Sequence, residues 1–168
     1  YQKMLKEAII TLKKGKKDYI ETWSPMINIG LSVLIPENYV KDLSTRMSLY
    51  RKAGDLKTGK EISNFLDELI ERFGPLPREV NNLVFTISLK IKCIKLNINY
   101  VDVGPKAILI GFKNNNFVNP SRLIKWISLN QNYVKLRKDQ KIIMKYRDGY
   151  TNKIKGLKEY INTIENLI

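Results

Sequence analysis

Residues 58–77 read TGKEISNFLDELIERFGPLP and contain the clearest element of the chain. Thr58 and Glu61 form a T-x-x-E capping box, which satisfies free backbone N–H groups at the start of a helix. An uninterrupted apolar stripe at helical spacing follows, and its members are Ile62, Phe65, Leu66, Leu69, Ile70 and Phe73. Gly74 and Pro75 come next, in the order expected of a helix C-cap. This stretch predicts an amphipathic helix that buries one face.

Other helices are predicted on both sides of it by the same spacing of apolar residues. One covers residues 39–53, with Val40, Leu43, Met47 and Tyr50 inward, and one begins near Pro77, with Val80, Leu83, Val84, Ile87, Ile91 and Ile94 inward. A short one starts at Asn119–Pro120 with Leu123, Ile124, Trp126 and Ile127, and a last one runs from about residue 151 with Ile154, Leu157, Ile161, Ile164 and Ile168 inward.

Strands are predicted where apolar residues alternate or form short β-branched runs. The first covers residues 26–35 and is stopped by Pro36. The others are residues 98–103, 107–112, 133–137 and 141–146. Because helices come first and short strands later, the sequence predicts an α+β fold, with several amphipathic helices packed on a small, mainly antiparallel sheet.

The composition argues against most catalytic chemistry. The 168 residues include no histidine and a single cysteine, Cys93, which lacks the base that usually activates a thiol. There is no GxxxxGK[ST], GxGxxG or GxSxG motif. We therefore expect no enzyme, no cofactor and no metal in this piece. No apolar run is long enough for a membrane span and the N-terminus has no signal-peptide pattern, so we expect a cytoplasmic chain without a membrane partner.

The start of the chain predicts a domain boundary. Residues 1–14 have helical apolar spacing and lead into the basic run of residues 13–17, KKGKK. Because the sequence begins at Tyr1 without methionine, we expect a piece of a longer protein. Residues 1–17 are predicted to be a tail and linker, and residues 18–168 the domain.

An acidic group on the capped helix contrasts with the net charge of +14. At 100° per residue, Asp67, Glu68 and Glu71 lie opposite the apolar stripe. Glu68 and Glu71 stand towards the C-terminal end, where the helix dipole disfavours negative charge, although Arg72 is placed to pair with Glu68 at i,i+4. The group is either an ordinary solvated face or a docking surface for an arginine-bearing partner.

A basic group between Lys135 and Lys158 predicts a second candidate surface. The residues singled out for nucleic-acid contact are Lys135, Arg137, Lys138, Lys141, Lys145 and Arg147, with Tyr133, Tyr146 and Tyr150 interleaved. A hairpin and helix of this charge suit phosphates. Drift of an AT-rich genome towards lysine and asparagine codons explains the composition equally well.

Five stretches in order resemble the C-terminal part of bacterial transcription-repair coupling factors. Residues 1–9 (YQKMLKEAI) resemble the closing helix of that family's translocase module. The others are residues 34–40 (LIPENYV), 46–51 (RMSLYR), 68–77 (ELIERFGPLP) and 118–120 (VNP). The resemblance covers essentially the whole chain. It departs at Glu71, often Asp in the family, and at Lys41, often proline.

The resemblance implies a non-catalytic, monomeric regulatory domain of an ATP-driven DNA translocase that removes stalled RNA polymerase and recruits UvrA. Such a domain docks on the N-terminal UvrA-binding module of its own parent chain and masks it. The acids of this contact map onto Glu68 and Glu71, and Arg72 orients or joins them. Two alternatives stay open: an accessory domain that binds nucleic acid through the basic surface of residues 135–158, and an unrecognised enzyme.

Overall fold

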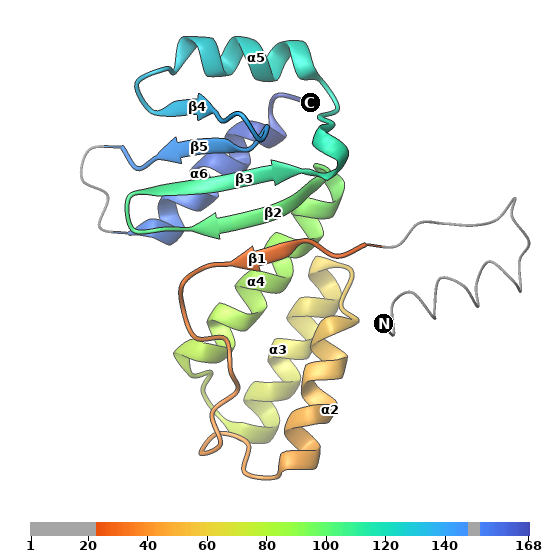
Figure 1. Cartoon of the computed structure of the whole chain (residues 1–168). Coiled ribbons are helices and arrows are strands. Elements are labelled where there is room, and N and C mark those ends of the chain that lie inside the picture. The colour runs from red at the N-terminus through yellow and green to blue at the C-terminus, as the bar shows by residue number, and fades with distance from the viewer. Residues whose placement is uncertain (1–22, 148–151) are drawn as a thin grey trace, which may run out of the picture.

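The structure is a computed structural model that describes residues 23–147 and 152–168 (Figure 1). The predicted N-terminal helix and the proposed tail of residues 1–17 lie outside the described residues. The elements in chain order are β1 (Met26–Asn28), α2 (Leu43–Gly54), α3 (Gly59–Phe73), α4 (Arg78–Lys95), β2 (Ile98–Val103), β3 (Ala107–Phe112), the 3-10 turn η2 (Lys113–Asn115), α5 (Pro120–Leu129), β4 (Val134–Leu136), β5 (Ile142–Lys145) and α6 (Lys153–Glu165).

The strands form one five-stranded sheet in the order β1-β2-β3-β5-β4. β1 pairs parallel with β2, and the other three pairings are antiparallel. The predicted α+β fold with a mainly antiparallel sheet is therefore confirmed, and the strand ranges 98–103 and 107–112 are reproduced.

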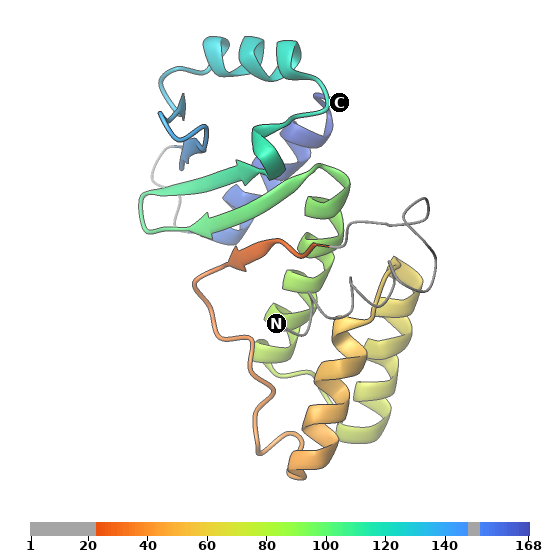
Figure 2. The ribbon, with the colours of Figure 1, turned by 45° about the vertical axis from the view of Figure 1, so that its right-hand side comes forward.

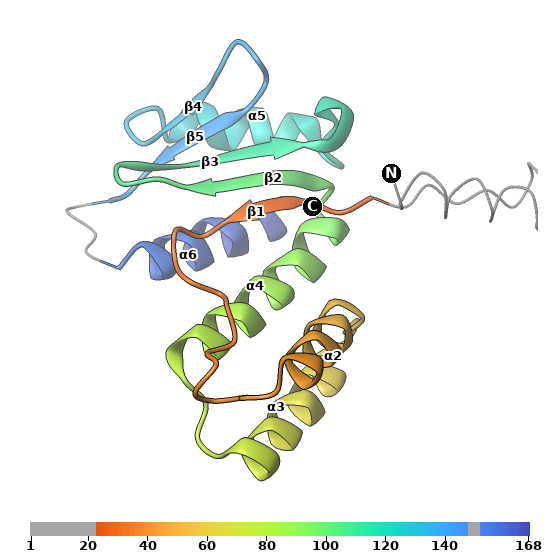
Figure 3. The same cartoon turned by 60° about the horizontal axis from the view of Figure 1, so that its bottom comes forward.

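The sheet buries one face. Alternate residues of its central strands, among them Ile108, Ile110, Ile142 and Met144, are 0% exposed. They share a core with the C-terminal half of α4 and with α6, which lie on the same side of the sheet (Figure 3). α5 flanks the β4 edge, where Trp126 meets the ring of Tyr160 on α6 at 6.3 Å between centroids. The alternation of side chains along strands explains why one face is apolar.

A second core joins α2, α3 and the first half of α4, away from the sheet (Figure 2). Phe65 and Leu69 on α3 are 1% exposed and pack there with Val80 of α4. Further along α4, Leu89 and Cys93 belong to the sheet core instead. α4 is therefore shared by both cores and connects them.

The prediction of one strand over residues 26–35 was wrong, because the strand ends at Asn28. The side chain of Asn28 accepts a hydrogen bond from Gly30 N–H, and Gly30 adopts φ +70°, so the chain leaves the sheet. Ile29 is buried in the sheet core and Ile35 in the helical core. The apolar alternation therefore reflects a loop that runs between two cores.

The inward face predicted for residues 39–53 was also partly wrong. The helix begins at Leu43, after Asp42 caps it by accepting from Thr45 N–H. Leu49 and Ala53 are buried, whereas Leu43 and Met47 are exposed. Predicted buried faces were likewise too wide at Ile70, Ile94 and Ile168, all of which are exposed.

Because α4 belongs to both cores, we expect them to unfold together. Leu69→Ala should destabilise the helical core by about 3 kcal/mol through lost contacts and a cavity. Both tryptophans lie in the sheet half, where Trp126 packs against the sheet core. In Leu69→Ala, the midpoint of thermal unfolding measured by helical circular dichroism and the midpoint measured by tryptophan fluorescence should therefore shift by the same amount. The exposed control Leu129→Ala should leave both midpoints unchanged, and loss of helix before the fluorescence change would contradict a shared transition.

Candidate functional site

Thr58 caps helix α3 as the sequence predicts, but the return bond of the capping box goes to the N–H of Lys57, one residue before the cap. The hydroxyl of Thr58 accepts a hydrogen bond from Glu61 N–H at 3.1 Å, and the carboxylate of Glu61 accepts from Lys57 N–H at 3.1 Å. Phe65 and Leu69 face the core from the opposite side to the acids. The burial of one face therefore fixes which side chains α3 presents to solvent.

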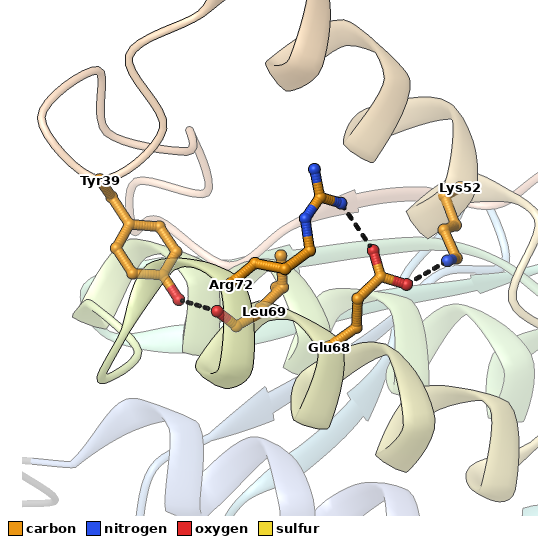
Figure 4. Close-up of polar contacts among 5 residues, drawn as sticks. All are labelled: Tyr39, Lys52, Glu68, Leu69 and Arg72. Carbon is orange, nitrogen blue, oxygen red and sulfur yellow. Dashed lines mark hydrogen bonds and ion pairs between the residues drawn. The ribbon is translucent and has the colours of Figure 1, made fainter.

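Glu68 is held by two cations (Figure 4). One carboxylate oxygen accepts from Lys52 Nζ of α2, and the other accepts from Arg72 Nη1 at 2.9 Å, so the i,i+4 pair is confirmed. The hydrogen bond from Lys52, followed by that from Arg72 and their positive charges, lowers the pKa of Glu68 below its usual value. The side chain is 28% exposed, so the carboxylate is oriented yet still reachable from solvent.

Arg72 contacts both Glu68 and the aromatic residue at the end of α3. Its guanidinium carbon lies 4.8 Å from the centroid of the Phe73 ring, which meets the Tyr39 ring at 5.7 Å. The Tyr39 hydroxyl donates to the carbonyl oxygens of Leu69 at 3.2 Å and Gly74 at 2.9 Å. These contacts tie the last turn of α3 to the loop before α2, and Figure 4 shows the one between Tyr39 and Leu69.

Glu71 lacks the side-chain partners that Glu68 has, although the sequence pattern predicted the same docking role for both. Glu71 and Asp67 are exposed, and neither side chain has a hydrogen bond or ion pair with another described residue. The sequence also missed Lys52, because no helical spacing on α3 points to a residue of α2. The site therefore combines an oriented carboxylate with an open one.

A shallow hollow of about 290 Å³ lies beside Glu68, between α2 and α3. Its lining residues are Lys52, Asp55, Leu56, Glu61, Asn64, Phe65 and Glu68. Three carboxylates face a single lysine there, so the hollow favours a cationic group.

The predicted basic surface is divided by the fold. Lys135 and Lys145 each follow a buried residue, Val134 and Met144, and point away from the sheet core. Lys141, just before β5, lies with its ammonium 4.9 Å from the centroid of the Tyr100 ring. The lysines of α6 belong to the layer on the other side of the sheet (Figure 3). The basic run is therefore not one continuous surface.

The remaining members of that group have local partners or lie at the turn. Arg137 pairs with Asp139 at 2.8 Å, and Lys138 is exposed beside them. Arg147 lies 4.8 Å from the Tyr133 ring centroid and donates to the side-chain oxygen of Asn130 at 3.1 Å.

Three further observations concern possible metal ligands, membrane-spanning helices and the cysteine. None of the described residues form a group of three potential metal ligands, and none of the described helices has the length and apolarity needed to cross a bilayer. Cys93 is 0% exposed, and burial raises its pKa to about 12. A buried neutral thiol is a structural group.

These features describe a small α+β domain with a charged surface on α3. In fold it is similar to a solved crystal structure of the C-terminal domain of a transcription-repair coupling factor, with a TM-score of 0.68 and 18% identity over 86% of this chain and 93% of the other. The sequence profile of the TRCF domain matches residues 29–123. The chain belongs to the TRCF domain family.

Curated relatives extend the similarity beyond the profile. A transcription-repair-coupling factor of Rickettsia conorii is 38% identical over 143 residues, which cover 85% of this chain and 13% of the relative. The Escherichia coli transcription-repair-coupling factor is 31% identical over 127 residues, or 74% of this chain and 11% of that protein. The chain thus spans about an eighth of the length of these relatives, since the shares are 13% and 11%.

The pairing of Glu68 predicts a pH-dependent contribution to stability. Because the folded-state pKa is lowered, the contribution is present above about pH 4.5 and is lost as the pH falls below that value. Glu68→Gln should lower the free energy of unfolding by about 0.5 kcal/mol near neutral pH and leave it unchanged in acid. The effect is small because the cations that pair with Glu68 are largely exposed. Glu71→Gln is the control and should cost nothing at either pH. Urea unfolding at both pH values measures this, and equal costs for the two variants would contradict the pairing.

Cys93 should be unreactive in the folded chain. A thiol reagent should modify it only as the chain unfolds, whereas the urea-denatured chain should react at once. Because the folded pKa is raised to about 12, the folded state keeps the proton that the unfolded state loses above about pH 8.5, so stability should fall as pH rises further. Rapid reaction of the folded chain, with no change in its circular dichroism, would contradict a structural thiol.

Proposed function

We propose that this chain is the C-terminal regulatory domain of a transcription-repair coupling factor and that it docks through α3 on the N-terminal UvrA-binding module of the same parent chain. The docked state masks the UvrA-recruiting surface. Residues 18–168 form the domain, residues 1–17 belong to the preceding translocase module, and this piece has no catalysis of its own. The parent is a cytoplasmic, ATP-driven DNA translocase that acts on stalled RNA polymerase.

One observation carries the proposal: α3 presents an acidic face with one oriented carboxylate, Glu68, on a chain whose net charge is +14. Glu68 is already oriented by Lys52 and Arg72, and Tyr39 holds the last turn of the helix. Because these side chains are fixed before binding, less conformational entropy is lost when a partner arrives.

Arginines of the partner suit this face better than lysines. A guanidinium can bond both oxygens of a carboxylate in parallel, and Glu71 has both oxygens open to another chain. The hollow beside Glu68 offers the carboxylates of Asp55 and Glu61 to a second cation. Arg72 lies over Phe73 and keeps Glu68 in place, so its role is that of a positioning residue.

The docking contact predicts a loss of affinity in the Glu68→Ala/Glu71→Ala variant. Desolvated Glu–Arg pairs contribute on the order of 2 kcal/mol, or roughly thirtyfold in affinity. Titration of the isotope-labelled chain with the UvrA-binding module, followed by NMR shifts, measures this and should place the shifted signals on α2 and α3. In the full-length parent, the same variant should bind UvrA more tightly.

A matched control removes the same charge elsewhere. Glu159→Ala/Glu165→Ala lies on the exposed side of α6 and should leave docking unchanged. Equal affinity of the wild type and the α3 variant would move the contact away from α3. An equal loss in both variants would mean that net charge, and not this helix, determines binding.

A further inference from the structure

One face of the sheet carries no helix from the described part of the chain. Ile108, Ile110 and Met144 point into the core, where α4 and α6 lie, so their neighbours along the strands point to the opposite side (Figure 3). We call this opposite side the outer face. Its members are Met26 and Asn28 on β1, Tyr100 and Asp102 on β2, Ala107, Leu109 and Gly111 on β3, Ile143 and Lys145 on β5, Lys135 on β4, and Lys141 just before β5.

The outer face is flat, partly apolar and basic at one side. Leu109 lies opposite Ile143 at its centre, and Ile143 lies opposite Lys135 on the edge strand. Three lysines of this face, Lys135, Lys141 and Lys145, stand against one acid of the face, Asp102, which lies on the β1 side. Lys141 Nζ also pairs with Asp139 of the preceding turn at 3.7 Å, which offsets part of its charge. The face therefore attracts anions mainly over β4 and β5.

Two aromatic rings at one end of the outer face each contact the ammonium group of a lysine. Lys141 Nζ lies 4.9 Å from the Tyr100 ring centroid, and Lys113 Nζ lies 5.1 Å from that of Trp23. These four residues line one open hollow of about 380 Å³, together with Ser24, Met26 and Asn99. Rings and ammonium groups are thus exposed to the same solvent space.

Gly111 makes this arrangement possible. It stands between Tyr100 and Lys141, and a Cβ atom there would come within 3.4 Å of Tyr100 Cβ and 3.3 Å of Lys141 Cγ. Without a side chain at this position, the stem of Lys141 can lie across β3 and reach the ring. The sequence run of basic residues does not include Gly111, Tyr100 or Trp23, so the linear pattern did not predict this group.

We propose that the outer face binds single-stranded DNA, with bases stacked on Tyr100 and Trp23 and phosphates held by Lys141, Lys113 and Lys135. Stacking on aromatic rings beside a cationic track is the usual way in which proteins hold unpaired strands. A phosphate draws Lys141 from the Tyr100 ring and from Asp139 at small cost, because cation–π contacts and ion pairs at exposed sites are both weak. This inference is independent of docking through α3, since it uses residues of the sheet half.

Single-stranded DNA fits better than two other anions. A duplex keeps the faces of its bases stacked inside and exposes only base edges, sugars and phosphates, so the two rings would have no base face to stack on. An acidic peptide would use the lysines and leave both rings without a partner. The ring-bearing hollow therefore favours unpaired bases.

The test is fluorescence anisotropy with a labelled twenty-nucleotide oligothymidylate and the 168-residue chain. Tyr100→Leu keeps an apolar side chain on β2, removes the ring, and should weaken binding by about tenfold, the loss of one stacked base. Lys141→Gln should reduce the slope of log K against log salt by about 0.7, the value for one phosphate contact on a single strand. Thermal unfolding of each variant verifies that the fold is kept.

A matched control and two competitors complete the design. Lys155→Gln on α6 removes one positive charge from the other layer and should leave the affinity and the salt slope unchanged. An equal effect of Lys155→Gln and Lys141→Gln would overturn the proposal in favour of general charge attraction. Tighter binding of a DNA duplex, or of an oligouridylate of the same length, would also overturn it, as would a Tyr100→Leu variant that binds like the wild type.

Discussion

The sharing of α4 between two cores is the constraint on which the rest of the structure depends. Val80 and Val84 pack with α2 and α3, and two turns later Leu89 and Cys93 pack under the sheet. A helix of this length spans about 27 Å, so it separates the acidic face of α3 from the outer face of the sheet while fixing both to one backbone. The two candidate surfaces therefore belong to different cores of the same folded unit.

The chemistry of α3 follows from what lies beneath and beside it. Phe65 and Leu69 leave the opposite side of the helix to carboxylates, and Lys52 on α2 then fixes the orientation of one of them. In a chain of net charge +14, this local acidic region is where a basic partner is least repelled. Electrostatic complementarity of this kind mainly determines which partner binds and in which orientation, and affinity depends on how far the pairs are desolvated.

Periodicity predicted the elements whose contacts are local, and failed where distant residues decide. The capping box at Thr58 and the alternation in residues 98–103 and 107–112 correspond to elements of the structure. The alternation of residues 26–35 did not, because Ile29 and Ile35 are buried in different cores. On the candidate surfaces, the acids of α3 could be predicted from a helical wheel. Lys52 could not, because its pairing with Glu68 spans two helices, and the basic run could not be split without knowing which strand residues face outward.

The shared helix also bears on whether the two surfaces influence one another. A ligand shifts an equilibrium only by its differential affinity for two states, so coupling between the surfaces requires an element with two arrangements. α4 is poorly suited to that role, since Val80 and Cys93 are 0% exposed at its two ends and any shift of the helix would open cavities in both cores. Docking through α3 and binding at the sheet are then expected to be independent. On the proposed docking, a ligand bound at the outer face is therefore not expected to release α3.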